Sequence, residues 1–173
     1  MFYAAQAGRA EVVRKLLAAR ANTEVAVKEP YEGYVTPLVA AAEEGHLEVV
    51  RALLKAGANV SHRSRSGKTA LTAAAQNGHT EVVGVLVDAF KKIRKDLRLL
   101  DTALWWAVVL GNVATVELLL SAGASPHATS MFEGRIYSAL QMAKKQRSKS
   151  KLRLLEAALK TPQPARKGVT KGL

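Results

Sequence analysis

The side chains in this chain that are best suited to catalysis or metal binding are its four histidines. His46 and His79 lie 33 residues apart in matching surroundings, which a repeated structural position explains better than a metal site. His62 and His127 have no carboxylate or second histidine at ligand spacing. We therefore expect no metal site and assign none of these side chains to catalysis.

One adjacent pair of carboxylates, Glu43 and Glu44, has the residue types of an acid–base pair. The corresponding positions 33 residues later hold Gln76 and Asn77, so the pair is not a required feature of the pattern. The chain also lacks a Walker loop, a Gly-x-Ser-x-Gly motif and a His-Glu-x-x-His motif. We expect no enzyme activity and no cofactor.

The composition favours one domain built from closely packed helices. The chain has 173 residues, of which 49% are hydrophobic but only 5% aromatic, so Ala, Leu and Val must form the core. The absence of cysteine excludes disulfides and thiolate metal sites. Because neither a signal peptide nor a transmembrane run is present, we expect a cytoplasmic protein, with the nucleus as the alternative.

The net charge of +12 is concentrated in the second half of the chain. Residues 1–90 hold 10 Lys and Arg against 9 Asp and Glu, whereas residues 91–173 hold 16 against 5. A near-neutral half joined to a strongly basic half indicates an acidic partner for the second half.

A repeat of 33 residues organises the sequence. Thr-Pro-Leu at 36–38 is followed by Thr-Ala-Leu at 69–71 and again at 102–104, with a looser copy at 138–140. Glycines recur in phase, at Gly8, Gly45, Gly78 and Gly111. Apolar residues spaced by one, three and four positions follow each glycine, so each unit is predicted to be helix, tight turn, helix and loop.

Helix ends can be assigned within this repeat. Hydroxyl side chains that suit N-caps open the first helix of each unit, at Thr36, Thr69, Thr102 and Ser138. Pro37 suits the first helical position, where its missing N–H is not needed. The in-phase glycines are predicted to end this helix with a positive φ.

These features closely resemble the ankyrin repeat family. The matching stretches are TPLVAAAEEGHLEVVRALLKAGA at 36–58 and TALTAAAQNGHTEVV at 69–83. The resemblance implies an all-α solenoid of about five helix-turn-helix repeats whose first and last repeats are caps. The expected repeats are 1–33, 34–66, 67–99, 100–135 and 136–160, followed by a basic disordered tail at 161–173.

The sequence departs from the family pattern in places. Arg20 stands where glycine is usual, which predicts a non-glycine residue in the left-handed region. Phe90 and Lys91 replace a Gly-Ala ending, so the helix there is predicted to continue toward Lys95. Loops 25–35 and 127–137 are longer than standard, and insertions of this kind often lie on the binding face.

The resemblance also implies the function, which is non-enzymatic binding of a partner protein in a concave groove by a monomeric scaffold. The residues matching the exposed groove positions are Glu43, Arg63, Arg65, Lys68, Gln76, Asn77, Arg98, Asp101, Trp105, Trp106 and Val109. Trp105, Trp106, Arg65 and Arg98 are the best anchors, because Trp and Arg are enriched at interface hot spots.

The two tryptophans are neighbours and therefore point about 100° apart on a helix. One alternative places one ring in the core and the other in the groove beside Val109; the other packs both rings between repeats. The groove alternative predicts that Trp105→Ala or Trp106→Ala weakens binding without unfolding the stack.

Two basic runs, 91–98 and 144–153, leave further alternatives. As solvated helix ends and a polar cap they need no ligand, which is the interpretation we favour. As binding elements they indicate electrostatic attachment to nucleic acid or an anionic membrane surface, or a nuclear localisation signal. The chain is also compatible with a targeting module of a larger protein.

Overall fold

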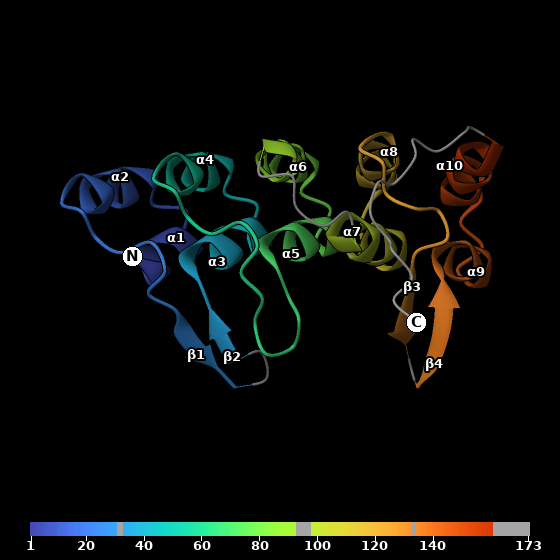
Figure 1. Cartoon of the computed structure of the whole chain (residues 1–173), viewed down its shortest axis with the longest axis horizontal. Coiled ribbons are helices and arrows are strands. Elements are labelled where there is room, and N and C mark those ends of the chain that lie inside the picture. Colours follow the sequence, from blue (N-terminus) through green and yellow to red (C-terminus); the bar gives the residue numbers. More distant parts are fainter. Residues whose placement is uncertain (31–32, 93–97, 133, 161–173) are drawn as a thin grey trace, which may run out of the picture.

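Pairs of antiparallel helices follow one another along the chain and form two layers in the computed structural model (Figure 1). The structure describes residues 1–30, 33–92, 98–132 and 134–160. The inner layer consists of α1 (Phe2–Gln6), α3 (Pro37–Glu43), α5 (Ala70–Gln76), α7 (Arg98–Val109) and α9 (Ala139–Lys145). The outer layer consists of α2 (Ala10–Ala18), α4 (Leu47–Lys55), α6 (Thr80–Lys92), α8 (Val113–Ser121) and α10 (Lys149–Lys160). Each helix packs on its neighbours within its layer and on its partner across the layers, as a helical solenoid requires.

The core lies between the two layers and runs the length of the stack. The alanine blocks 40–42 and 73–75 are buried, and their small side chains allow α3, α5 and α7 to approach closely. The outer helices contribute Val and Leu, such as Leu53 and Leu86, which are fully buried. The Ala, Leu and Val core predicted from the composition is therefore confirmed.

Two short antiparallel hairpins correct the expectation of a wholly helical chain. The first pairs β1 (Val27–Glu29) with β2 (Gly33–Val35), and the second pairs β3 (Thr129–Phe132) with β4 (Arg135–Ser138). Both occupy the loops that were expected to be longer than standard. In Figure 1 they project, together with the segment 58–68, from the inner layer on the side away from the outer helices.

The predicted caps are found at most inner helices. Thr69 and Ser138 each accept a hydrogen bond from the backbone N–H three residues on, in reciprocal capping boxes. Thr36 is the N-cap of α3 and Pro37 follows it, but the buried Thr36 hydroxyl makes no hydrogen bond within the described residues.

The N-cap prediction at Thr102 is wrong, because α7 already begins at Arg98. The Thr102 hydroxyl instead donates to the carbonyl of Arg98, 3.1 Å away. Leu99 and Leu100 are buried, so the helix gains apolar burial by starting earlier.

Three of the four in-phase glycines end their helices as predicted. Gly8, Gly45 and Gly78 have φ between 66° and 75°, and Arg20 has φ 58° as expected from its place in the repeat. Gly111 corrects the pattern, since it does not have a positive φ. A Cβ at Gly111 would overlap the carbonyl oxygen of Ala75, so glycine permits close backbone approach there.

The second helix of the third unit runs on to Lys92, past the position where a Gly-Ala ending is usual. The predicted continuation to Lys95, the middle of the first basic run at 93–97 and the predicted tail at 161–173 lie outside the described residues. None of the helices in the described ranges is both long and apolar enough to cross a membrane.

Candidate functional site

His46 and His79 join neighbouring units of the stack. The ring Nε2 of His46 lies 2.9 Å from the carbonyl oxygen of Gln6, and the Nε2 of His79 lies 2.9 Å from that of Glu43. Because a carbonyl only accepts, Nε2 carries the proton in both rings. Each histidine thus satisfies a carbonyl at the end of the preceding inner helix, which explains the 33-residue spacing.

In the next unit Asn112 performs the equivalent task. Its Nδ2 donates to the carbonyl of Gly78 at 2.7 Å, and its Oδ1 accepts from the backbone N–H of Thr115 at 2.8 Å. Asn112 is therefore both the N-cap of α8 and a link to the preceding unit.

At the end of α7 the linking side chain is a buried lysine. The Lys151 Nζ donates to the carbonyls of Val108 and Gly111, at 2.7 and 2.9 Å, and Gln146 donates to the carbonyl of Val109. Burial lowers the pKa of Lys151 below its ordinary value of 10.5. One member of the second basic run is thus committed to the fold.

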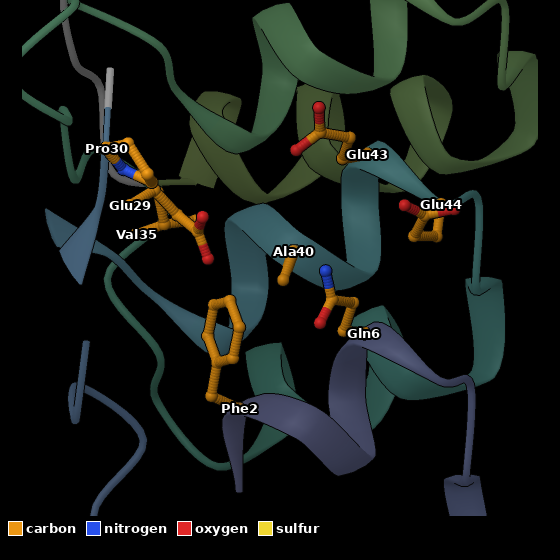
Figure 2. Close-up of a pocket in the computed structure, with 8 residues that line it drawn as sticks. All are labelled: Phe2, Gln6, Glu29, Pro30, Val35, Ala40, Glu43 and Glu44. Atoms are coloured by element: carbon orange, nitrogen blue, oxygen red, sulfur yellow. The ribbon is translucent and has the colours of Figure 1, made fainter. Parts of the chain in front are cut away.

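A pocket of about 300 Å³ opens between the first two inner helices and the first hairpin. Figure 2 shows Phe2 and Gln6 on α1, Ala40 and Glu43 on α3, and Glu44 at the C-cap of α3. Its lining residues are Phe2, Gln6, Glu29, Pro30, Val35, Ala40, Glu43 and Glu44. Three carboxylates on this lining give the pocket an acidic character although the whole chain is basic.

The sequence interpretation placed Glu43 at this surface but did not place Phe2, Gln6, Glu29 or Pro30 there. The long loop 25–35 was the available signal, because it carries Glu29 and Pro30. The pairing of α1 with α3 could not be read from spacing alone.

Two predicted site residues come together in an ion pair. The Lys68 Nζ lies 2.7 Å from the Glu43 carboxylate, with only 14% of the lysine side chain exposed. This contact ties the segment before α5 to the end of α3. The Lys68 side chain therefore holds Glu43 in place and leaves little of its own charge exposed to solvent.

The segment 58–68 also packs against the first hairpin. The His62 Nε2 hydrogen bonds to the carbonyl of Tyr34 at 3.0 Å, and Gly33 lies against the Cβ of Arg65. Arg65 and Arg63 are exposed, as predicted. On α5 and its C-cap, Gln76 is partly exposed and Asn77 is exposed.

The expectation that Trp105 and Val109 line a groove is corrected. Trp105 is fully buried and its Nε1 donates to the carbonyl of Tyr137 at 2.9 Å, while Val109 is 8% exposed. Trp106 is partly buried and meets Trp105 edge to face, with ring centroids 5.2 Å apart. Of the two rings, only that of Trp106 reaches the surface.

Asp101 and Arg98 begin the same helix but differ in role. The Asp101 carboxylate accepts a hydrogen bond from the backbone N–H of Ser125 at 2.7 Å, so it fastens the loop after α8. The Arg98 side chain is exposed.

The second hairpin carries an exposed apolar pair. Met131 and Ile136 are directly opposite each other across the strands and are 68% and 70% exposed. The sequence interpretation identified the long loop 127–137, which holds both residues, but did not pair Met131 with Ile136. Strand alternation, which places the two on one face, was the missing signal.

Among the residues that the structure describes, no three His, Asp or Glu side chains gather where they could hold a metal ion.

Comparison with known families supports the repeat pattern directly. Residues 38–87 match a family model described as "Ankyrin repeats (many copies)", and residues 100–131 match one described as "Ankyrin repeat". No curated protein matches the chain.

Proposed function

The chain carries ankyrin repeats, and from this premise we propose that it is a non-enzymatic scaffold that binds a partner protein. Ankyrin repeats generally mediate protein–protein interaction. The proposed binding surface, called here the inner face, consists of the exposed sides of the inner helices, the two hairpins and the segment 58–68.

The pocket at the first hairpin is the observation that supports this proposal most strongly. It opens on the inner face and is built from α1, β1, the turn after it, β2 and α3. A pocket shared by several elements that hydrogen bonds and an ion pair hold in place is preorganised, so little conformational entropy is lost on binding. A partner side chain inserted there would meet Glu29, Glu43 and Glu44 together with the apolar lining residues Phe2, Pro30, Val35 and Ala40.

The contact residues divide into presenting and positioning groups. We propose that exposed or partly exposed side chains contact the partner, namely Glu43, Arg63, Arg65, Gln76, Asn77, Arg98 and Trp106. Lys68 and Asp101 act by holding Glu43 and the loop after α8 in place. Trp105 and Val109 are buried, so they do not belong to the proposed contact residues.

A matched pair of charge reversals tests the inner face. Affinity capture followed by mass spectrometry identifies a partner, and calorimetry then measures Kd for the wild type, Arg65→Glu and Lys55→Glu. Both residues are exposed, but Lys55 ends the outer helix α4. We expect Arg65→Glu to weaken binding at least about tenfold, which corresponds to 1.4 kcal/mol, and Lys55→Glu to leave it unchanged. Equal effects of the two variants would contradict the proposal.

Electrostatic binding of nucleic acid or an anionic membrane is the second candidate function. It is supported by the stretch between Glu133 and Glu156, which holds seven Lys and Arg and no acid. Binding of DNA, RNA and anionic liposomes, measured from about 50 mM salt upward, tests it, because the electrostatic contribution is largest at low salt. No binding at about 50 mM salt would rule it out.

A further inference from the structure

We propose that the pocket between α1, α3 and the first hairpin, called here the hairpin pocket, binds an arginine side chain of the partner protein. This inference rests on the proposed function and specifies the partner's chemistry at one place on the inner face. The hairpin pocket has a volume of about 300 Å³, and ligand sites range from roughly 300 to 1,000 Å³. A pocket of this size fits one extended side chain and is too small for a helix.

The register of the first hairpin directs Glu29 into the pocket. Glu29 lies two residues after Val27, which pairs with the buried Val35, so Glu29 and Val35 occupy the same face of the hairpin and both line the pocket. The residue opposite Glu29 is Gly33, which has no side chain to cover the carboxylate. Lys28 belongs to the other face of the strand and is exposed there, so it does not direct its charge into the pocket.

Two of the three carboxylates that line the pocket are left without a cation. Glu43 is paired with Lys68. Across the described ranges, no ion pair and no side-chain hydrogen bond involves Glu29 or Glu44, and Arg65, which packs against the same hairpin, pairs with neither. Because the whole chain carries a net charge of +12, it repels cations in general. A cation that binds the hairpin pocket must therefore be held by these local carboxylates.

The arrangement of these carboxylates suits an extended cation better than a metal ion. Glu29 ends β1, whereas Glu43 and Glu44 lie at the end of α3. In the part of the chain that the structure describes, they do not come close enough together to hold one metal ion. The guanidinium group of arginine has five N–H donors in a planar fork and can bind carboxylates that come from different elements, whereas the ammonium group of lysine is a compact point charge. This difference favours arginine.

Apolar side chains line the same pocket as the carboxylates. In Figure 2 the Glu29 side chain points from the hairpin toward the side of α3 on which the Phe2 ring lies. Phe2 and Ala40 are almost buried, and the pocket exposes the little surface that they leave open. The methylene groups of an arginine side chain can pack on this apolar surface while its guanidinium group binds the carboxylates. The guanidinium plane can also stack on an aromatic ring.

The charge of the pocket also excludes other occupants. A carboxylate or phosphate group of a partner would be repelled by Glu29 and Glu44, and an apolar side chain would cover these charges without pairing with them. Arginine alone among the common side chains combines a permanent positive charge, several donors and an apolar stem. The hairpin pocket therefore selects a basic segment of the partner, although the second half of the chain is itself strongly basic.

An NMR titration with capped peptides tests the hairpin pocket. The peptides share one Gly-Ser sequence and carry arginine, citrulline, lysine or norleucine at the centre, where citrulline keeps the shape of arginine without its charge. We expect the arginine peptide to shift the amide signals of Phe2, Gln6 and Ala40 saturably. It should bind at least about tenfold more tightly than the citrulline and norleucine peptides, because it alone forms charge-assisted hydrogen bonds that suit these carboxylates, and more tightly than the lysine peptide. No saturable shift with the arginine peptide, or equal binding of any other peptide, would overturn the proposal.

A pair of double variants with equal loss of charge locates the binding. Glu29→Gln with Glu44→Gln should weaken binding of the arginine peptide by about tenfold or more and remove its preference over the citrulline peptide. Glu81→Gln with Glu117→Gln, at exposed positions on the outer helices α6 and α8, is the control and should leave binding unchanged. Circular dichroism should show that both variants are folded. Undiminished binding of the arginine peptide by the first variant would overturn the proposal.

The peptide titration separates this inference from the proposed function, because it does not depend on the captured partner. If the arginine peptide fails to bind while Arg65→Glu still weakens binding of the partner, the assignment of arginine to the hairpin pocket is wrong and the proposed function stands. If Arg65→Glu and Lys55→Glu change the Kd of the partner equally, the proposed function is contradicted whatever the peptides show.

Discussion

The Nε2 of His79 lies 2.9 Å from the carbonyl oxygen of Glu43, which is 36 residues earlier in the chain and belongs to the preceding helix pair. The side chain of the same Glu43 forms the ion pair with Lys68. One residue at the end of α3 is thus fastened through its backbone and its carboxylate to the following unit. The rigidity of the inner face depends on links of this kind.

Replacing His79 with alanine should lower the free energy of unfolding by about 1–3 kcal/mol, because the Glu43 carbonyl loses its donor. Urea unfolding followed by circular dichroism measures the change. His127→Ala, in an exposed loop position, is the control and should stay within about 0.5 kcal/mol of wild type. A similar stability for both variants would show that the His79 link contributes little.

Gly45→Ala should destabilise the stack more than Gly57→Ala. Both glycines have positive φ, 75° and 86°, so each alanine incurs the left-handed backbone cost of about 1–2 kcal/mol. A Cβ at Gly45 would in addition lie within 2.6 Å of the His79 ring, whereas one at Gly57 would meet nothing within 4 Å. Thermal melts of the two variants compare the effects, and equal melting temperatures would refute the clash.

Trp105→Ala should lower the free energy of unfolding by about 3–5 kcal/mol, because the missing side chain leaves a cavity in the core. The stack should therefore unfold at a lower denaturant concentration. The Tyr137 carbonyl would also lose its indole donor. This expectation replaces the sequence-based prediction that Trp105→Ala weakens binding alone. Trp106→Ala, at a partly exposed position, should cost less stability and should weaken partner binding. Guanidinium titration and calorimetry separate the two outcomes, and a Trp105→Ala variant as stable as wild type would contradict the buried position.

Lys151→Met should lower stability by about 1–3 kcal/mol at neutral pH, because the Val108 and Gly111 carbonyls lose their donor while the apolar stem is kept. The pKa of Lys151 is lowered in the folded chain. As pH rises through this folded pKa toward 10.5, the unfolded chain holds more protons, so the wild type gains stability relative to Lys151→Met. Urea unfolding of both proteins from pH 7 to pH 10 measures this difference. A constant difference across that range would show that burial does not perturb Lys151.

Much of the local structure could be predicted from single residues in their repeat positions. Pro37 at the start of a helix, Arg20 in the left-handed region and the capping boxes at Thr69 and Ser138 depend on backbone geometry within a few residues. Interactions of short range are encoded by residue type and spacing, so a sequence pattern can specify them.

The orientation of α7 could not be predicted in this way. Its residues Leu99, Leu100, Ala103, Leu104, Trp105, Ala107, Val108 and Val109 are all buried. A helix that is apolar on most sides has no polar stripe to mark its exposed face. Packing of α7 between α5, α8 and α9 therefore decides that Trp105 faces inward and Trp106 outward.

The sequence by itself determined the helix-turn-helix repeat and the uneven charge, because both depend on composition and periodicity. The tertiary structure alone decided which of those residues form a surface. It buried Lys151 against the end of α7, joined α1, α3 and the first hairpin around an acidic pocket, and exposed Met131 and Ile136 side by side. These outcomes depend on contacts between residues far apart in the chain, whose geometry follows from packing the layers together and is not contained in any one repeat.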